Sequence, residues 1–155
     1  MDVVITAERP DAPDAAALIR ELDEHLAPRY PASSRYAFSV AKLLETGVEF
    51  YVLRADGEVA ACGGVLFGED LGQPYGEVKR MYVRPAFRGN GFGKRILDHV
   101  AARARERGVA ILRLETGMHQ VEAIGLYERV GFRRIEAFGP YVHDPLSRYY
   151  EQVLA

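Results

Sequence analysis

Apolar residues follow a helical period in four stretches of the chain and fall in strand-like runs in seven others. The first helical stretch opens at Asp14 and ends before Pro28, with an apolar residue every three or four positions. The longest stretch runs over Phe92–Arg107, presents one apolar face, and is followed by Gly108, a residue typical of helix ends. Two shorter helices are predicted over Tyr36–Leu44 and Glu122–Val130.

The strand-like runs are bounded by glycine, proline and other turn residues. They predict strands over Val3–Thr6, Glu49–Leu53, Val59–Phe67, Glu77–Val83, Val109–Glu115, Arg133–Phe138 and Arg148–Leu154. The dipeptide Asp56-Gly57 is typical of a tight hairpin turn, and Leu71–Tyr75 is predicted to be a connecting segment. A strand, a long helix and a further strand follow one another over residues 77–115, so we expect parallel pairing with a right-handed crossover there. The fold class is therefore α/β of the mixed α+β kind, with a mixed sheet of about six to seven strands flanked by about four helices.

The composition indicates one globular domain over residues 1–155. The chain is 48% hydrophobic and 27% charged, and no repeat or long linker divides it. Its single cysteine, Cys62, lies in an apolar run, so we expect a buried thiol, no internal disulfide and no thiolate zinc site. The four histidines are scattered, so no metal is expected. The sequence shows no leader and no span of ~20 apolar residues, which favours a cytoplasmic protein that does not act at a membrane.

Charge is distributed unevenly along the chain. Residues 1–78 hold 6 basic and 14 acidic residues, residues 79–107 hold 9 and 2, and residues 108–155 hold 5 and 6. A basic block this local argues against a general nucleic-acid surface and favours one anionic ligand held in one place, although a solvated basic helix face has the same composition.

A glycine-rich turn, Arg88-Gly89-Asn90-Gly91-Phe92-Gly93-Lys94, joins a predicted strand to the longest helix. Glycines at such a turn allow positive φ, and the first N–H groups of the helix favour phosphate. A nucleotide-triphosphate loop needs glycine at Arg88 and Ser or Thr at Arg95, and a dinucleotide fingerprint needs glycine at Lys94. Both nucleotide-binding interpretations therefore fail on spacing.

The turn instead resembles the acyl-CoA pyrophosphate loop of the GNAT superfamily of N-acyltransferases. The family pattern Arg/Gln-x-x-Gly-x-Gly/Ala is met by Arg88, Gly91 and Gly93. The strand ending Lys79-Arg80-Met81-Tyr82-Val83-Arg84-Pro85 stands before it, and Ala123-Ile124-Gly125-Leu126-Tyr127-Glu128-Arg129-Val130-Gly131-Phe132 follows it, as in that family. The resemblance is strongest over residues 77–138.

This resemblance implies a GNAT-like fold whose sheet splays between Glu77–Val83 and Val109–Glu115, with acyl-CoA in the gap. A bulge in the first of these strands would expose backbone N–H groups to the pantetheine arm. The implied cofactor-binding residues are Met81, Tyr82, Val83, Arg88, Gly89, Asn90, Gly91, Phe92, Gly93, Lys94 and, through its side chain, Gln120. Arg95 either joins them or is merely exposed.

Two catalytic residues follow from the same resemblance. Tyr127 occupies the family's tyrosine that points at the coenzyme A sulfur, and a phenol suits a general acid because it stays protonated at neutral pH. Glu77 lies where one branch of the family carries its catalytic glutamate, and we interpret it as the base, acting through an ordered water. The ordinary alternatives are that Tyr127 only packs in the core and that Glu77 is only solvated.

The resulting hypothesis is an acetyl-CoA-dependent N-acetyltransferase that acts by direct attack of a primary amine, on a small molecule or a peptide. His25, Tyr141, His143 and Asp144 are candidates for the acceptor pocket. The alternative from another class is a coenzyme A sensor without turnover. Dimers are frequent in this family, so a homodimer is compatible with the resemblance.

Overall fold

The computed structural model describes residues 1–34 and 39–154. These residues form one seven-stranded sheet in the order β1-β2-β3-β4-β5-β7-β6. The strands are β1 (Val3–Ala7), β2 (Glu49–Ala55), β3 (Glu58–Asp70), β4 (Gln73–Val83), β5 (Ile111–Gly117), β6 (Arg133–Ile135) and β7 (Ser147–Val153). The α-helices are α1 (Pro13–Leu26), α2 (Val40–Thr46), α3 (Phe92–Glu106) and α4 (Val121–Arg129). The predicted mixed fold is confirmed.

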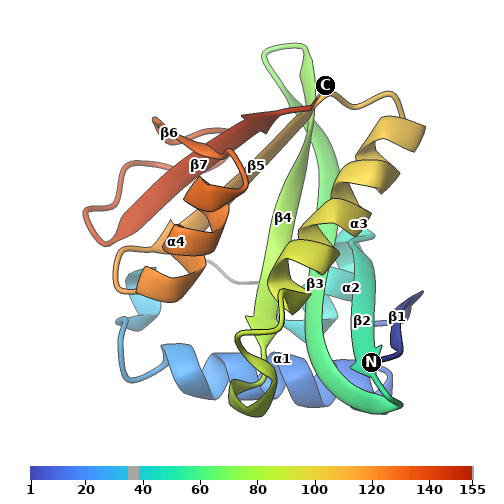
Figure 1. The fold of residues 1–155 in the computed structure, drawn as a ribbon. Helices are drawn as coiled ribbons and strands as arrows, with labels where there is room; N and C mark the ends of the chain where they lie inside the picture. The colour runs from blue at the N-terminus through green and yellow to red at the C-terminus, as the bar shows by residue number, and fades with distance from the viewer. Residues whose placement is uncertain (35–38, 155) are drawn as a thin grey trace.

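The sheet splays where β4 meets β5. These two strands are parallel and pair only at Gly76 with Leu112 and at Glu77 with Arg113. They converge at one end and spread apart toward the other, while α3 connects them across one face (Figure 1). All other neighbouring strands are antiparallel. The expected parallel unit and its divergence are therefore both present.

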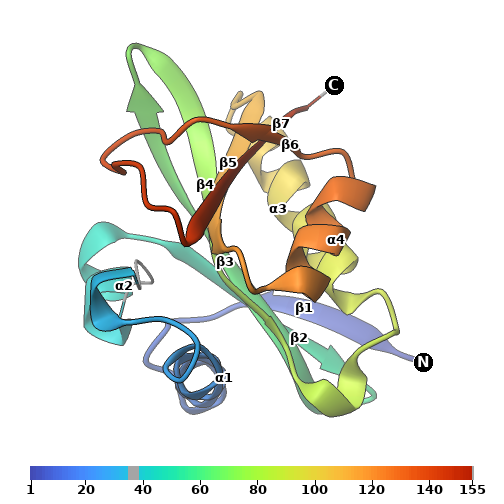
Figure 2. The same cartoon turned by 90° about the vertical axis from the view of Figure 1, so that its left-hand side faces the viewer.

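Helices cover both faces of the sheet (Figure 2). The core beneath α3 and α4 includes Ile96, Val100 and Tyr127, packed against Leu112 and Leu114 of β5. The core beneath α1 and α2 joins their apolar residues to one another and to β2, β3 and β4. The two cores lie on opposite faces because successive residues of a strand point to opposite sides of the sheet.

A bulge in β4 changes this alternation beside the splay. Arg80 has a φ of 56°, and the register between β3 and β4 shifts between Cys62 and Gly64. Val78 and Met81 both pack with the core of α3, whereas the Arg80 guanidinium reaches α1 and donates to Ile19 O at 2.9 Å. The bulge therefore lies in the strand where the resemblance placed it.

Three predicted boundaries differ from the structure. The segment Leu71–Tyr75 was expected to be a connection, but β4 begins at Gln73, and only Leu71 and Gly72 lie between the paired strands, both at positive φ. The strand expected over Arg133–Phe138 ends at Ile135. Of the helix expected over Tyr36–Leu44, residues 36–38 lie outside the described part, and α2 runs from Val40 to Thr46 between Ser39 and Gly47 caps.

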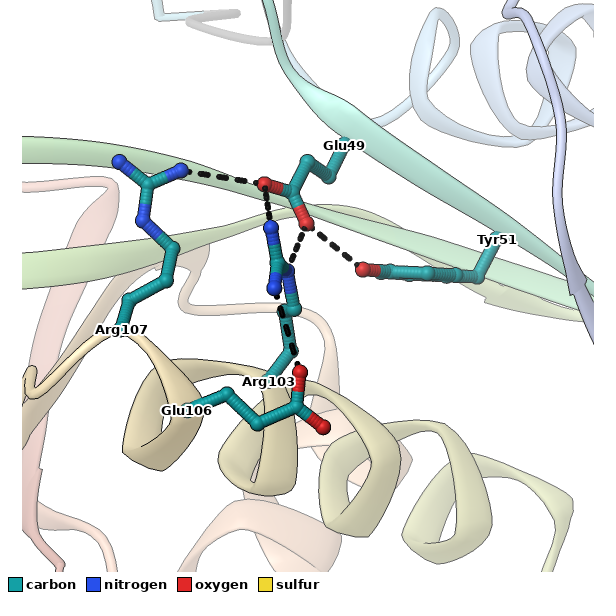
Figure 3. Close-up of polar contacts among 5 residues, drawn as sticks. All are labelled: Glu49, Tyr51, Arg103, Glu106 and Arg107. Atoms are coloured by element: carbon teal, nitrogen blue, oxygen red, sulfur yellow. Dashed lines mark hydrogen bonds and ion pairs between the residues drawn. The ribbon is translucent and has the colours of Figure 1, made fainter.

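Part of the basic block has a structural role at the end of α3. Arg103 binds both oxygens of Glu49 on β2, at 2.6 and 3.2 Å, and Arg107 binds the same carboxylate at 3.2 Å (Figure 3). Tyr51 donates to Glu49 at 2.9 Å, and burial together with this carboxylate raises the pKa of Tyr51 to about 12. These arginines therefore anchor α3 to the sheet and do not contribute to an anion site.

Candidate active site

The glycine-rich turn opens α3 with two glycines in the left-handed region. Gly89 has a φ of 82°, and Gly91, which caps α3, has a φ of 76°. A Cβ built on either glycine meets no atom within 4 Å, so backbone conformation, and not crowding by the protein, demands glycine there. The first-turn N–H groups of α3 lack helical acceptors and suit a phosphate.

Gly93 has a different purpose from the other two glycines. A Cβ there would lie 2.7 Å from Leu126 Cδ2 of α4. The absence of a side chain at Gly93 lets α4 pack directly on the first turn of α3. The helix that carries Tyr127 is thus held against the turn that is expected to bind phosphate.

A groove of about 630 Å³ runs from this turn along β4 to the start of α4. It brings together most of the residues predicted to bind the cofactor. These are Met81, Tyr82, Val83, Arg88, Gly89, Gly91, Phe92, Gly93, Lys94 and Gln120, with Tyr127 at its inner end.

Two residues of the predicted set lie elsewhere. The side-chain amide of Asn90 donates to Phe87 O at 3.0 Å and to Arg88 O at 3.4 Å, so it stabilises the turn and does not line the groove. Arg95 is exposed and lies outside the groove lining, which matches the second of its two expected placements.

The two cations expected at the pyrophosphate make only exposed contacts with protein carboxylates. Lys94 Nζ lies 2.9 Å from Asp98, and Arg88 Nη1 lies 3.7 Å from Glu122. Exposed pairs of this kind stabilise a protein by ~0–1 kcal/mol, so a phosphate can displace them at little cost. Both side chains are therefore available to an anion in the groove.

A second cavity of about 100 Å³ lies beyond the groove, on the α1 side of the splayed strands. It shares four lining residues with the groove, namely Leu22, Met81, Gln120 and Tyr127. Its other lining residues include Glu77, Lys79, Glu115 and Tyr141. The two cavities thus meet at Tyr127, one large enough for a cofactor arm and the other for a small group.

Tyr127 is 5% exposed and its ring packs edge-on against Phe132. Its hydroxyl makes no hydrogen bond to any residue of the described chain, although it lines both cavities. Burial, with a smaller contribution from the Glu115 charge, raises the pKa of Tyr127 above that of an ordinary phenol. The residue therefore packs in the core and also presents a protonated hydroxyl at the junction.

Glu77 is 4% exposed, so the alternative of a solvated carboxylate is wrong. Lys79 Nζ lies 2.9 Å from Glu77 Oε2, and the Tyr141 hydroxyl donates to the same oxygen. Lys79 also donates to Tyr141 at 3.0 Å. Burial and the Glu77 charge raise the pKa of Tyr141, which keeps this phenol protonated.

Glu115 is a site residue that the sequence analysis missed. Its carboxylate lines the second cavity and accepts a hydrogen bond from Ser147 Oγ at 2.8 Å. Burial raises the pKa of Glu115 from 4.5 to about 7. A signal was present, because Arg113 and Glu115 alternate with apolar residues in a strand beside the crossover, and ligands gather at the carboxyl ends of such strands.

Of the four residues expected to line the acceptor pocket, two line a cavity and two do not. His25 lines the groove and Tyr141 the second cavity, whereas His143 and Asp144 line neither. Cys62 is buried as predicted, and burial raises the pKa of its thiol to about 12, which excludes a reactive thiolate.

No group of three or more His, Cys, Asp and Glu in residues 1–34 and 39–154 is placed to hold a metal ion. None of the helices in these ranges has the length and apolar character needed to cross a bilayer.

Comparison with known proteins identifies the family. A family model described as Acetyltransferase (GNAT) family matches residues 15–132. A protein from Azospirillum brasilense named IAA acetyltransferase is 40% identical over 153 residues, which cover 99% of each chain. A Klebsiella pneumoniae structure described as a candidate acyl-CoA N-acyltransferase is 36% identical, with a TM-score of 0.81 over 99% of this chain and 98% of that one.

A more distant structure shares the fold alone. The PaiA N-acetyltransferase of Thermoplasma acidophilum, solved in complex with coenzyme A, has a TM-score of 0.75 at 18% identity, over 99% of each chain. The family model and the two nearer proteins carry the assignment. The chain therefore belongs to the acetyltransferase (GNAT) family, and its activity is acetyl transfer from acetyl-CoA.

Proposed function

We propose that this protein transfers the acetyl group of acetyl-CoA directly to a primary amine, with Tyr127 facing the leaving sulfur. The observation that carries the proposal is the position of Tyr127, whose hydroxyl has no partner in the described chain and stands where the groove meets the second cavity. The groove would hold the cofactor and the second cavity the acceptor.

The residues of the groove fit coenzyme A by their chemistry. The α3 N-terminus, Arg88 and Lys94 would bind the pyrophosphate, since N–H groups and cations both favour phosphate. The backbone of Met81 and Val83 would pair with the pantetheine arm, because β4 pairs with β5 only at Gly76 and Glu77 and the bulge at Arg80 lies just before these residues. Gln120 lines both cavities and is placed to contact the same arm.

Acetyl-CoA supplies a thioester, whose carbonyl carbon accepts the amine nitrogen while its bond to sulfur breaks. The amine must lose its ammonium proton before the attack and a second proton after it, and the sulfur leaves as a thiolate that gains one. Tyr127 would donate a hydrogen bond and then its proton to this sulfur. Its raised pKa keeps the hydroxyl protonated until negative charge builds on the sulfur.

Two carboxylates of the second cavity, Glu77 and Glu115, are candidates for the base. Glu77 is held by the Lys79 ammonium and the Tyr141 hydroxyl, and both contacts are made to the same oxygen, Oε2. Among the described residues Glu115 receives a hydrogen bond from the Ser147 hydroxyl alone, and its pKa of about 7 matches the pH at which a base in a cell must work. We therefore propose that Glu115 accepts the proton and that Glu77 positions Lys79 and Tyr141.

The test is coenzyme A release from acetyl-CoA with a panel of primary amines and short peptides, together with calorimetric titration of coenzyme A. We expect binding of coenzyme A and amine-dependent thiol release. A folded protein that binds coenzyme A but acetylates no amine would favour the sensor alternative, which none of the relatives named above supports. A folded protein that does not bind coenzyme A would refute the proposal.

A further inference from the structure

The charges around the second cavity leave one carboxylate without a cation. Glu77 and Lys79 neutralise each other at 2.9 Å. Glu115 forms no ion pair with any described residue, and its hydrogen bond comes from the neutral Ser147 hydroxyl. Of the two lining carboxylates, Glu115 is therefore the one without an ion-pair partner among the described residues. A bound cation next to Glu115 would supply the missing partner.

The walls of this cavity suit a small ammonium group. Tyr30, Tyr127 and Tyr141 line it, and tyrosine rings attract cations through their faces. Its volume is about 100 Å³. A water molecule in the liquid takes up ~30 Å³, so about three small groups fit. Tyr127, which is 5% exposed and whose hydroxyl has no partner in the described chain, is one of the residues that line this space.

One cation of the lining, the Arg80 guanidinium, would instead suit an acceptor that carries a negative charge. Arg80 belongs to the cavity lining, and its Nε and Nη1 atoms have no hydrogen-bond partner in the described part of the chain. Its side chain is only 1% exposed, however, and Nη2 is bound to Asp23 at 2.6 Å and to Ile19 O. A carboxylate inside the cavity could reach this guanidinium only by displacing the contact between β4 and α1.

From this arrangement we infer that the acceptor is a primary amine with no carboxylate on the carbon that bears the nitrogen, as in aminoalkyl groups and the α-amines of peptides and amides. Free α-amino acids are excluded. The inference rests on the proposed function, because it places the acceptor nitrogen between Glu115 and Tyr127. An α-carboxylate would then lie among Glu77, Glu115 and three phenol rings, where the two lining cations of the described chain, Lys79 and Arg80, are already paired with Glu77 and Asp23.

A matched set of small acceptors distinguishes the effect of the acceptor's charge on the rate from the effect of its size. Ethylamine, glycinamide and glycine share an aminomethyl group and differ in the group attached to it, which is methyl, amide or carboxylate. Rates of thiol release are compared at equal concentration of the neutral amine, because these groups also change the amine's own pKa. We expect glycine to show a kcat/KM at least ~10-fold below that of glycinamide and ethylamine.

A binding measurement avoids dependence on turnover. Coenzyme A, the product, forms a complex that cannot react, and ethylamine or glycine is titrated into it at pH 8, where Glu115 is ionised. Glu115→Gln retains the side-chain shape and removes the charge. We expect this variant to bind ethylammonium at least ~5-fold more weakly and glycine no more weakly than the wild type.

The outcomes distinguish a failure of this inference from a failure of the proposed function. Coenzyme A binding together with a preference for ethylamine and glycinamide supports the inference. Coenzyme A binding and acetylation with glycine as the preferred acceptor overturns the inference alone, and Arg80 would then be the group that recognises the carboxylate. Failure to bind coenzyme A overturns the proposed function and this inference with it.

Discussion

Replacing Glu115 with glutamine should make the protein more stable and less active. Burial raises the pKa of Glu115 from 4.5 to about 7, so ionising this carboxyl costs more in the folded state than in the unfolded chain. One pKa unit corresponds to ~1.4 kcal/mol, so above pH 8 the ionisation of Glu115 lowers the free energy of unfolding by about 3 kcal/mol. Glutamine stays neutral and its carbonyl can still accept the hydrogen bond from Ser147.

The pH dependence has a defined sign. Since the folded-state pKa lies above the unfolded one, the stabilising effect of a protonated Glu115 is complete below pH 4.5 and is lost as the pH rises through about 7. The groups whose charges act on Glu115 are Lys79, which lowers its pKa, and Glu77 and Asp144, which raise it. We therefore expect the stability advantage of Glu115→Gln to grow by roughly 2 kcal/mol between pH 5 and pH 8.

Urea unfolding of both proteins across this pH range measures the difference directly. Glu136→Gln is the matched control, because Glu136 is exposed and should leave stability unchanged at every pH. In the same samples, kcat/KM of the wild type should rise with an inflection near pH 7, and Glu115→Gln should lose ~10²- to 10⁴-fold in rate. A stability difference that stays flat from pH 5 to pH 8 would refute the reasoning.

Three further predictions concern other parts of the molecule. Tyr127→Phe should lower kcat by roughly 10²- to 10⁴-fold with coenzyme A affinity unchanged by calorimetry, and unchanged turnover would remove Tyr127 from its role. Gly91→Val should weaken coenzyme A binding and reduce stability by about 1–2 kcal/mol, because the φ of 76° strains any L side chain; a folded variant with normal affinity would contradict our placement of the pyrophosphate. Glu49→Gln should lower the free energy of unfolding by roughly 1 kcal/mol in low salt and less in high salt, since it breaks the contacts with Arg103 and Arg107.

Local sequence signals were sufficient for most of the fold. Strand and helix runs predicted all seven strands and the long helix, and Asp56-Gly57 marked a turn in which both residues have positive φ. One error occurred where a partner strand overrides local preference. Pro74 reads as a connection, yet it pairs with Glu69 inside a hairpin whose turn is only two residues long.

For the site, too, some features could be predicted from local sequence and others depend on tertiary packing. The sequence by itself indicated the turn that is expected to bind phosphate, because this turn is contiguous with the helix that follows it. Only the tertiary structure brought together the residues of the proposed acceptor side. Glu77, Glu115 and Tyr141 come from three distant segments, and the pKa values of Glu115 and Tyr141 are raised chiefly by burial. Burial is a property of the packed molecule, so no local pattern could show that Glu115 is buried there and forms no ion pair with any described residue.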